Sequence, residues 1–222
     1  APGGLLWHSF VPGEDMRKRY LPELRDPLLQ RIRQQYEAHY EQTFGRRAGK
    51  GLYRNHDWQR LEFALSLIPD DCRTVLDVGV GPGPFLNYLT LSGRFDAVTG
   101  IDKAQYSRFL QLTPELDYRI MSITETSFPD RSFDVVFCME VLEHLDTASL
   151  AAALPELRRI TKRRLVMSVP FDEPKPLPRY HLQHFDEQRL RAMFPDAEMV
   201  LLYRSRIRWT WPWAFVIEEF GG

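Results

Sequence analysis

The sequence of 222 residues predicts an α/β fold: a seven-stranded, mostly parallel sheet with helices on both faces and an antiparallel last strand. Short apolar runs alternate with amphipathic segments, a pattern typical of parallel strands joined by crossover helices. One run, at residues 75–78, ends in a glycine-rich turn. No helical pattern separates the last two runs, so we expect these two strands to pair antiparallel.

The predicted elements follow in regular order. A helix containing Trp58, Leu61, Leu65 and Ile68 on one face ends at Pro69. The strands are expected at residues 75–78, 97–102, 118–123, 133–139, 164–169, 197–202 and 213–220. Further helices are expected at residues 85–91, with Pro84 in the first turn, and at 106–112, 147–160 and 186–193, with Asp186 as N-cap.

The N-terminal segment has a different character. Residues 14–44 are charged and predict a helix, because their apolar residues recur on one helical face: Leu28, Leu29, Ile32, Tyr36 and Tyr40. A basic link at residues 45–51 follows. We therefore expect residues 1–55 to form an N-terminal helical lid and residues 56–222 to form the main domain.

Composition narrows the classes of function. The 29 Lys and Arg balance 30 Asp and Glu, and the sequence pI is about 6.7, so nucleic acid is not favoured as a partner. Of two cysteines, Cys138 lies in an apolar run, which indicates a reducing compartment and a cytoplasmic location. No long apolar run predicts a signal peptide or a membrane span.

The glycine-rich turn is the strongest functional signal. In VLDVGVGPGPF, residues 75–85, the glycines Gly79, Gly81 and Gly83 remove the Cβ atoms that would hold a ligand away from the main chain. Such a turn is shared by nicotinamide, flavin and adenosylmethionine proteins. Asp102 ends the next strand, where a carboxylate can accept hydrogen bonds from both ribose hydroxyls.

The segments beyond the turn distinguish between these cofactors. VLDVGVGPG, GID, FPDRSFDVV and CMEVLEH, beginning at residues 75, 100, 128 and 138, resemble the class I adenosylmethionine-dependent methyltransferases. The resemblance covers residues 57–220 and is greatest to the small-molecule branch that includes the ubiquinone-biosynthesis O-methyltransferases. It implies a Rossmann-like fold, S-adenosyl-L-methionine as cofactor and a small-molecule acceptor.

The resemblance also implies roles for individual residues. Asp77, Gly79 and Met139 would lie near the methionine part of the cofactor, while Gly81 and Gly83 would shape the turn. Asp102 would hold the ribose. The adenine would be met by Lys103, Ser122 and Ile123, and the cofactor carboxylate by Arg60. Ser122 departs from the Asp that is usual at its position, as do Val80 and Pro82 from the commoner small residues.

Candidate catalytic residues are histidines. His144 follows the fourth strand, at the sheet edge where ligands bind, and is a suitable general base for a hydroxyl acceptor. His181 and His184 lie in a proline-rich loop after the fifth strand, which we expect to contribute to the acceptor site and the lid. We predict O-methylation of a small molecule by in-line displacement, without a metal.

Two alternatives stay open. Glu140, Glu143 and His144 have the i, i+3, i+4 spacing of one helix side, and with His181 or His184 they could hold a divalent metal. That set resembles the metal site of RNA 3′-terminal 2′-O-methyltransferases. A non-catalytic binding module with the same fold is the other alternative.

Near the C-terminus we expect Arg204, Arg206 and Arg208 to share a solvated strand face, and Trp209, Trp211 and Trp213 to serve in packing.

Overall fold

The computed structural model describes residues 16–21, 23–45, 55–203 and 212–221, and within these it is an α/β sandwich. The strands are β1 (Arg17–Tyr20), β2 (Thr74–Val78), β3 (Ala97–Asp102), β4 (Asp117–Ile120), β5 (Phe133–Met139), β6 (Thr161–Pro170), β7 (Glu198–Tyr203) and β8 (Trp213–Glu219). The helices are α1 (Pro27–Phe44), α3 (Asn55–Leu65), α4 (Pro84–Leu91), the 3₁₀ turn η1 (Leu142–His144), α5 (Thr147–Ile160) and α6 (Glu187–Met193).

The strands form one sheet in the order β1-β7-β8-β6-β5-β2-β3-β4. Strand β2 lies between β3 and β5, and both pairings are parallel. Strand β8 pairs antiparallel with β6 and with β7. The seven predicted strands and the antiparallel last strand are therefore confirmed, and the structure adds an eighth strand.

The added strand corrects the prediction that all of residues 14–44 are helical. Strand β1 pairs parallel with β7, from Arg17 opposite Val200 to Tyr20 opposite Tyr203. Its sequence, RKRY, has no apolar alternation, so its strand conformation depends on pairing with an exposed sheet edge. Basic side chains on an outermost strand also discourage further pairing, and Arg17 lies 3.5 Å from Glu198 of β7.

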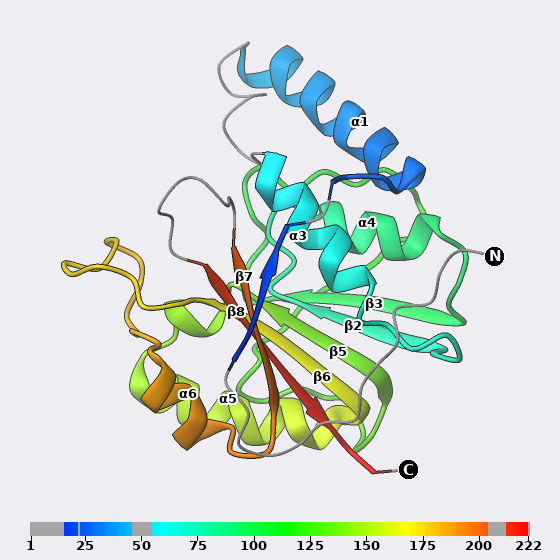
Figure 1. Cartoon of the computed structure of the whole chain (residues 1–222). Helices are drawn as coiled ribbons and strands as arrows, with labels where there is room; N and C mark the ends of the chain where they lie inside the picture. Colours follow the sequence, from blue (N-terminus) through cyan, green and yellow to red (C-terminus); the bar gives the residue numbers. More distant parts are fainter. Residues whose placement is uncertain (1–15, 22, 46–54, 204–211, 222) are drawn as a thin grey trace.

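Helices cover both faces of the sheet (Figure 1). Helices α1, α3 and α4 pack on one face, against Val75 of β2 and against Val135 and Phe137 of β5. Helices α5 and α6 pack on the other face, against Val136 and Cys138. Neighbouring residues of β5 thus enter opposite cores, as the period of two in a strand requires. No helix in the described part of the chain is long and apolar enough to cross a membrane.

Residues 106–112 also differ from the prediction, because they form a non-helical connection instead of a short helix. This segment lies against the glycine turn: the amide of Leu110 donates to the carbonyl of Pro82 at 3.1 Å. The Tyr36 hydroxyl of α1 lies 2.9 Å from the Pro82 carbonyl oxygen and 3.0 Å from that of Leu110. Helix α1 and this connection therefore support the glycine turn from one side.

The Tyr36 hydroxyl gives a first testable prediction. It also accepts a hydrogen bond from Asn87 at 2.9 Å in a buried environment. We expect Tyr36→Phe to lower the free energy of unfolding by about 2 kcal/mol, because buried polar groups lose a partner. Urea unfolding measures this. Tyr40→Phe, which removes a hydrogen bond to the Arg108 carbonyl away from the turn, is the comparison. Equal stability of Tyr36→Phe and the parent would contradict the prediction.

Several features expected from the sequence lie outside the residues that the structure describes. Residues 46–51 of the basic link are among them, as are Arg204, Arg206, Arg208, Trp209 and Trp211. Trp213 is described and is buried at the start of β8, which agrees with a role in packing.

Candidate functional site

The glycine turn joins β2 to α4 at the carboxyl edge of the sheet. Gly79, Gly81 and Gly83 have backbone φ angles of 75°, 54° and 93°, a region that residues other than glycine rarely adopt. A Cβ on Gly79 would lie 2.2 Å from a methyl carbon of Val141, so glycine is required there for packing as well. The turn is held to β3, because the Gly79 amide donates to the Ile101 carbonyl at 2.9 Å.

Asp102 lies directly beside this turn. Its Oδ2 accepts a hydrogen bond from the Gly81 amide at 3.0 Å. A pocket of about 540 Å³ opens at this point and extends from the turn towards the segment after β5. Its lining residues are Gly79, Gly81, Ile101, Asp102, Lys103, Tyr106, Ile123, Glu140, Val141, His144, Leu145, Arg179, Tyr180 and Leu182.

The pocket brings together six of the residues predicted from the sequence: Gly79, Gly81, Asp102, Lys103, Ile123 and His144. Gly83 instead lies at the N-cap of α4, where a Cβ would approach Phe109 to 2.8 Å. Ser122 is exposed and its hydroxyl lies 2.8 Å from that of Thr124. Met139 packs against the core under α1, α3 and α4. These three residues are outside the pocket lining.

Asp77 is buried at the end of β2, beneath the turn. Burial, with a smaller contribution from the charge of Asp102, raises the pKa of Asp77 to about 7. The side chain is outside the pocket lining but close enough to Asp102 for their charges to interact.

Arg60, which is buried, and Glu140, which is partly buried, form a polar network. Glu140 lines the pocket, and its Oε1 accepts from the Ser168 hydroxyl at 2.9 Å, while its Oε2 accepts from the Trp213 indole at 2.9 Å. A guanidinium nitrogen of Arg60 lies 3.6 Å from Glu140 Oε1, and the guanidinium covers the Trp213 ring at 5.1 Å. Arg60, predicted to meet the cofactor carboxylate, is therefore only 6% exposed and lies behind Glu140.

This network corrects the expectation that Glu140, Glu143 and His144 share one side of a helix. Glu140 has φ of 57° and precedes η1, which covers only Leu142–His144. Its carboxylate consequently points to Ser168 and Trp213 and is not part of the cluster that Glu143 and His144 form.

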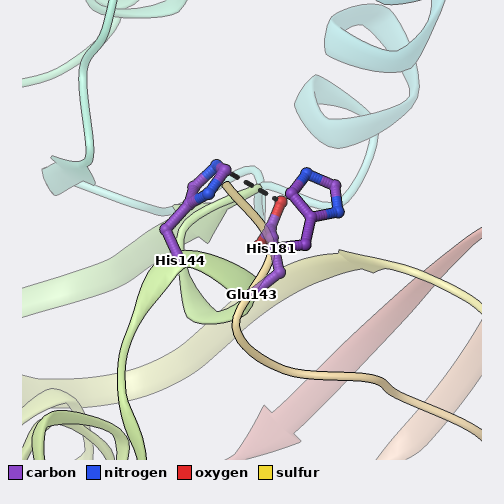
Figure 2. A group of neighbouring side chains, drawn as sticks. All are labelled: Glu143, His144 and His181. Atoms are coloured by element: carbon purple, nitrogen blue, oxygen red, sulfur yellow. Dashed lines mark ion pairs between the residues drawn. The ribbon is translucent and has the colours of Figure 1, made fainter. Parts of the chain in front are cut away.

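The cluster contains Glu143, His144 and His181, whose candidate ligand atoms all lie within 4.8 Å of one another (Figure 2). His144 Nδ1 is 2.8 Å from the Tyr180 carbonyl oxygen, and its Nε2 is 3.8 Å from Glu143 Oε1. His181 Nδ1 is 2.5 Å from Glu173 Oε2. Burial, followed by the charge of Glu140, holds the pKa of Glu143 well above its usual range.

His184 is not part of this cluster or of the pocket lining. Its Nε2 lies 3.5 Å from Asp172 and its Nδ1 lies 4.0 Å from Asp186, the N-cap of α6. The sequence placed it with His181 because both occur in one loop. In the structure the two histidines have different partners.

The methyltransferase domain family model matches residues 76–166, which run from β2 into β6 and include the glycine turn, Asp102 and the Glu143–His144 pair. Over these residues, which are less than half of the chain, the protein is similar to the methyltransferase domain family. The cofactor is S-adenosyl-L-methionine.

Individual relatives agree with this methyltransferase domain. The ubiquinone biosynthesis O-methyltransferase of Paracidovorax citrulli is 39% identical over 107 residues, which are 44% of this chain and 44% of the relative. An S-adenosylmethionine-dependent methyltransferase structure from Archaeoglobus fulgidus has a TM-score of 0.58 at 19% identity and covers 72% of this chain and 91% of its own. A small RNA methyltransferase structure has a TM-score of 0.58 at 20% identity, with 72% and 24% covered.

The curated relatives and the solved structures support different conclusions about this chain. The chain spans less than half the length of the curated relatives it matches. The two solved structures, at such low identity, show that the fold is shared.

The residues of the pocket fit the cofactor of a methyltransferase domain. A Cβ on Gly81 would have only the Gly79 carbonyl oxygen nearby, at 3.9 Å, so it would project into the open space beside the turn. Glycine leaves that space to a ligand. Asp102 adds a carboxylate at the same wall, and Ile123 adds an apolar surface. A main-chain wall, a carboxylate and an apolar side chain are what a nucleoside requires.

Sequence reasoning did not assign six of the residues that line the pocket. They come from connections between elements: Tyr106, Val141, Leu145, Arg179, Tyr180 and Leu182. Tyr180 is 72% exposed and Leu182 is 59% exposed, although both are large apolar side chains. Two signals in the sequence bear on them: Val141 lies in the CMEVLEH segment, and Arg179, Tyr180 and Leu182 lie in the proline-rich loop after β6, which was predicted to contribute to the acceptor site.

Proposed function

We propose that this chain transfers the methyl group of S-adenosyl-L-methionine to a hydroxyl oxygen of a small molecule. One observation carries the proposal: a single pocket is lined by two glycines of the turn, by Asp102 and by His144. The curated relatives named as ubiquinone biosynthesis O-methyltransferases support oxygen as the acceptor atom. The apolar rim formed by Tyr106, Tyr180 and Leu182 supports an acceptor with an apolar or aromatic body.

The cofactor would occupy the wall formed by the glycine turn. Main-chain groups of Gly79 and Gly81 would approach it closely, and Asp102 would accept hydrogen bonds from ribose hydroxyls while its Oδ2 keeps the turn in place. Lys103 and Ile123 would flank the adenine. When bound, the cofactor supplies an electrophilic methyl group on a positively charged sulfur.

The chain's task is then to align the acceptor, exclude water and accept a proton. The Nδ1 of His144 faces the Tyr180 carbonyl, which can only accept, so this nitrogen carries the hydrogen and Nε2 has the lone pair. His144 Nε2 would accept the proton of the acceptor hydroxyl as that oxygen takes the methyl group from the cofactor, whose sulfur would become neutral. His144 is therefore the proposed base.

His144→Ala tests this assignment. We expect kcat with a phenolic acceptor to fall about 100-fold or more, because a general base is lost, while affinity for S-adenosylhomocysteine changes less than about twofold. Methyl transfer from radiolabelled cofactor to a panel of phenols and catechols measures the rate, and titration calorimetry measures the affinity. Unchanged kcat in the variant would contradict the role of His144.

The same assay separates the alternatives for the whole protein. Transfer to terminal 2′-hydroxyls of RNA and not to any phenol would replace the small-molecule proposal. Absence of transfer to every acceptor by a protein that binds the cofactor would favour a non-catalytic binding module.

We further propose a cytoplasmic location. It is supported by Cys72 and Cys138, which are both buried free thiols.

A further inference from the structure

We infer that Arg179 selects an acceptor that carries a carboxylate, so that the substrate class of the pocket is a hydroxy acid with an apolar or aromatic body. The inference rests on the proposed function, because it concerns the molecule that receives the methyl group. Three features of the loop after β6 support it: the turn that contains Arg179, the hydrogen bonds that hold this turn to η1, and the charges that line the pocket.

Arg179 lies in a tight turn of the loop after β6. The amide of His181 donates to the Pro178 carbonyl at 2.9 Å, so Arg179 and Tyr180 occupy the two corner positions of a β-turn. Both corner residues line the pocket, and both are exposed. The turn therefore presents a cationic and an aromatic side chain together to the same pocket.

Hydrogen bonds hold this part of the loop to η1. The amides of Leu182 and Gln183 donate to the Glu143 carbonyl at 2.7 Å and 3.1 Å. Gln183 is only 5% exposed, and its side-chain nitrogen donates to the Leu145 carbonyl at 2.7 Å. Because these bonds are made on both sides of His144, the loop cannot shift without changing the environment of that histidine.

The turn is also bonded to the proposed base itself. His144 Nδ1 lies 2.8 Å from the carbonyl oxygen of Tyr180, the residue that follows Arg179. The main chain of Arg179 is thus one residue away from the group that orients His144. A substrate bound by the guanidinium would be held at a defined place relative to His144 Nε2.

The charges that line the pocket leave Arg179 for the acceptor. Besides His144, the lining contains two acidic and two basic residues: Asp102, Glu140, Lys103 and Arg179. The Asp102 carboxylate accepts from the glycine turn, and that of Glu140 accepts from a hydroxyl and an indole. The Arg179 guanidinium makes no hydrogen bond or ion pair with any residue that the structure describes. Lys103 follows Asp102 directly and is assigned to the adenine.

The guanidinium indicates the chemistry of the group it would bind. Its planar set of N–H donors matches a carboxylate with two parallel hydrogen bonds. One cation balances the single charge of a carboxylate, whereas a phosphate monoester carries close to two negative charges at neutral pH. The adjacent Tyr180 ring, which is 72% exposed, offers apolar surface to the body of the same molecule. Arg179 would determine specificity without contact with the reacting atoms.

Methyl transfer to paired probes tests the inference. Hydroxyphenylacetate, hydroxyphenylpropanoate and hydroxyphenylbutanoate each have a primary amide of similar shape that lacks the charge. We expect kcat/KM of the parent to be at least about 10-fold higher for the best acid than for its amide. Arg179→Gln should lower kcat/KM for that acid about 10-fold to 100-fold through KM, and should change the amide less than about twofold, because only substrate binding is lost.

Two further variants make the test specific to the guanidinium. Arg179→Lys keeps the charge without the planar set of donors, so it should recover part of the preference for the acid. Lys175→Gln removes an exposed cation of the same loop that is outside the pocket lining, and it is the matched control. This control should keep the preference of the parent. Thermal unfolding verifies that each variant is folded.

Calorimetric binding of the same acids and amides to the complex with S-adenosylhomocysteine distinguishes failure of this inference from failure of the proposed function. Tighter binding of the acid that depends on Arg179, without methyl transfer, would support the carboxylate site and contradict O-methylation. Absence of binding by every acid, equal use of acids and amides, or a preference that Arg179→Gln retains would each overturn the inference.

Discussion

Asp102→Ala is expected to weaken the binding of S-adenosylhomocysteine about 100-fold. If Asp102 accepts hydrogen bonds from ribose hydroxyls, the alanine variant loses charge-assisted bonds worth about 3 kcal/mol in total, which corresponds to about two powers of ten. The variant also leaves the Gly81 amide without the carboxylate that accepts its hydrogen bond at 3.0 Å. Titration calorimetry with S-adenosylhomocysteine measures the change.

Two further variants make this experiment specific. Asp102→Asn keeps an oxygen for Gly81 but removes the charge, so we expect an intermediate loss of about 10-fold. Asp117→Asn changes the carboxylate that accepts from Thr99 on the adjacent strand, outside the pocket lining, and should alter affinity less than about twofold. An Asp102→Ala protein that binds as tightly as the parent would show that the ribose is held elsewhere.

Asp77→Asn is expected to stabilise the ligand-free fold, and more at pH 8 than at pH 5. The pKa of Asp77 is about 7 in the folded protein, against 3.8 for an aspartate side chain in water. Between these values the folded state holds a proton that the unfolded state has lost, so the free energy of unfolding falls as pH rises towards 7. The complete loss is on the order of 4 kcal/mol, and about 3 kcal/mol of it occurs above pH 5.

Asparagine keeps the shape of Asp77 without its charge, so the variant should escape this loss. Urea unfolding of both proteins at pH 5 and pH 8 measures it. Asp134→Asn is the control of opposite sign. Burial raises the pKa of Asp134, but hydrogen bonds from the main-chain amides of Arg73 and Thr74, together with the Lys162 ammonium, outweigh burial and lower this pKa overall. That variant should be destabilised equally at both pH values. A difference between Asp77→Asn and the parent that does not vary with pH would contradict the assigned ionisation.

Strong local patterns accounted for most of the fold. The apolar runs predicted β2 to β8, and α5 was predicted with the bounds Thr147–Ile160. Asp186 caps α6 as expected, because its side chain accepts from the Arg189 amide. In these elements the burial pattern and the local capping signals agree, so one sequence was enough.

Elements that depend on tertiary contacts were predicted incorrectly. Strand β1 exists through its pairing with β7, and its RKRY sequence contains no strand signal. The connection at residues 106–112 is non-helical, and its main-chain groups bond to Pro82 and Tyr36. These interactions join positions far apart in the sequence, which propensity and periodicity do not register.

The same distinction between local patterns and tertiary contacts applies to the residues of the candidate site. The turn glycines and Asp102 follow from a short motif, because main-chain geometry next to a ligand restricts the residue type strongly. Glu140 could not be placed, since its left-handed backbone conformation turns it towards Trp213 and away from Glu143. The pairing of His181 with Glu173, and its approach to His144, likewise depends on how the loop after β6 folds back.

A crystal structure of the chain with S-adenosylhomocysteine tests the central claim most directly. The account predicts the ribose hydroxyls within hydrogen-bond distance of Asp102, the adenine between Lys103 and Ile123, and the sulfur on the side of the pocket lined by His144. A ligand bound away from the glycine turn, or a soaked crystal with an empty pocket at saturating ligand, would contradict it.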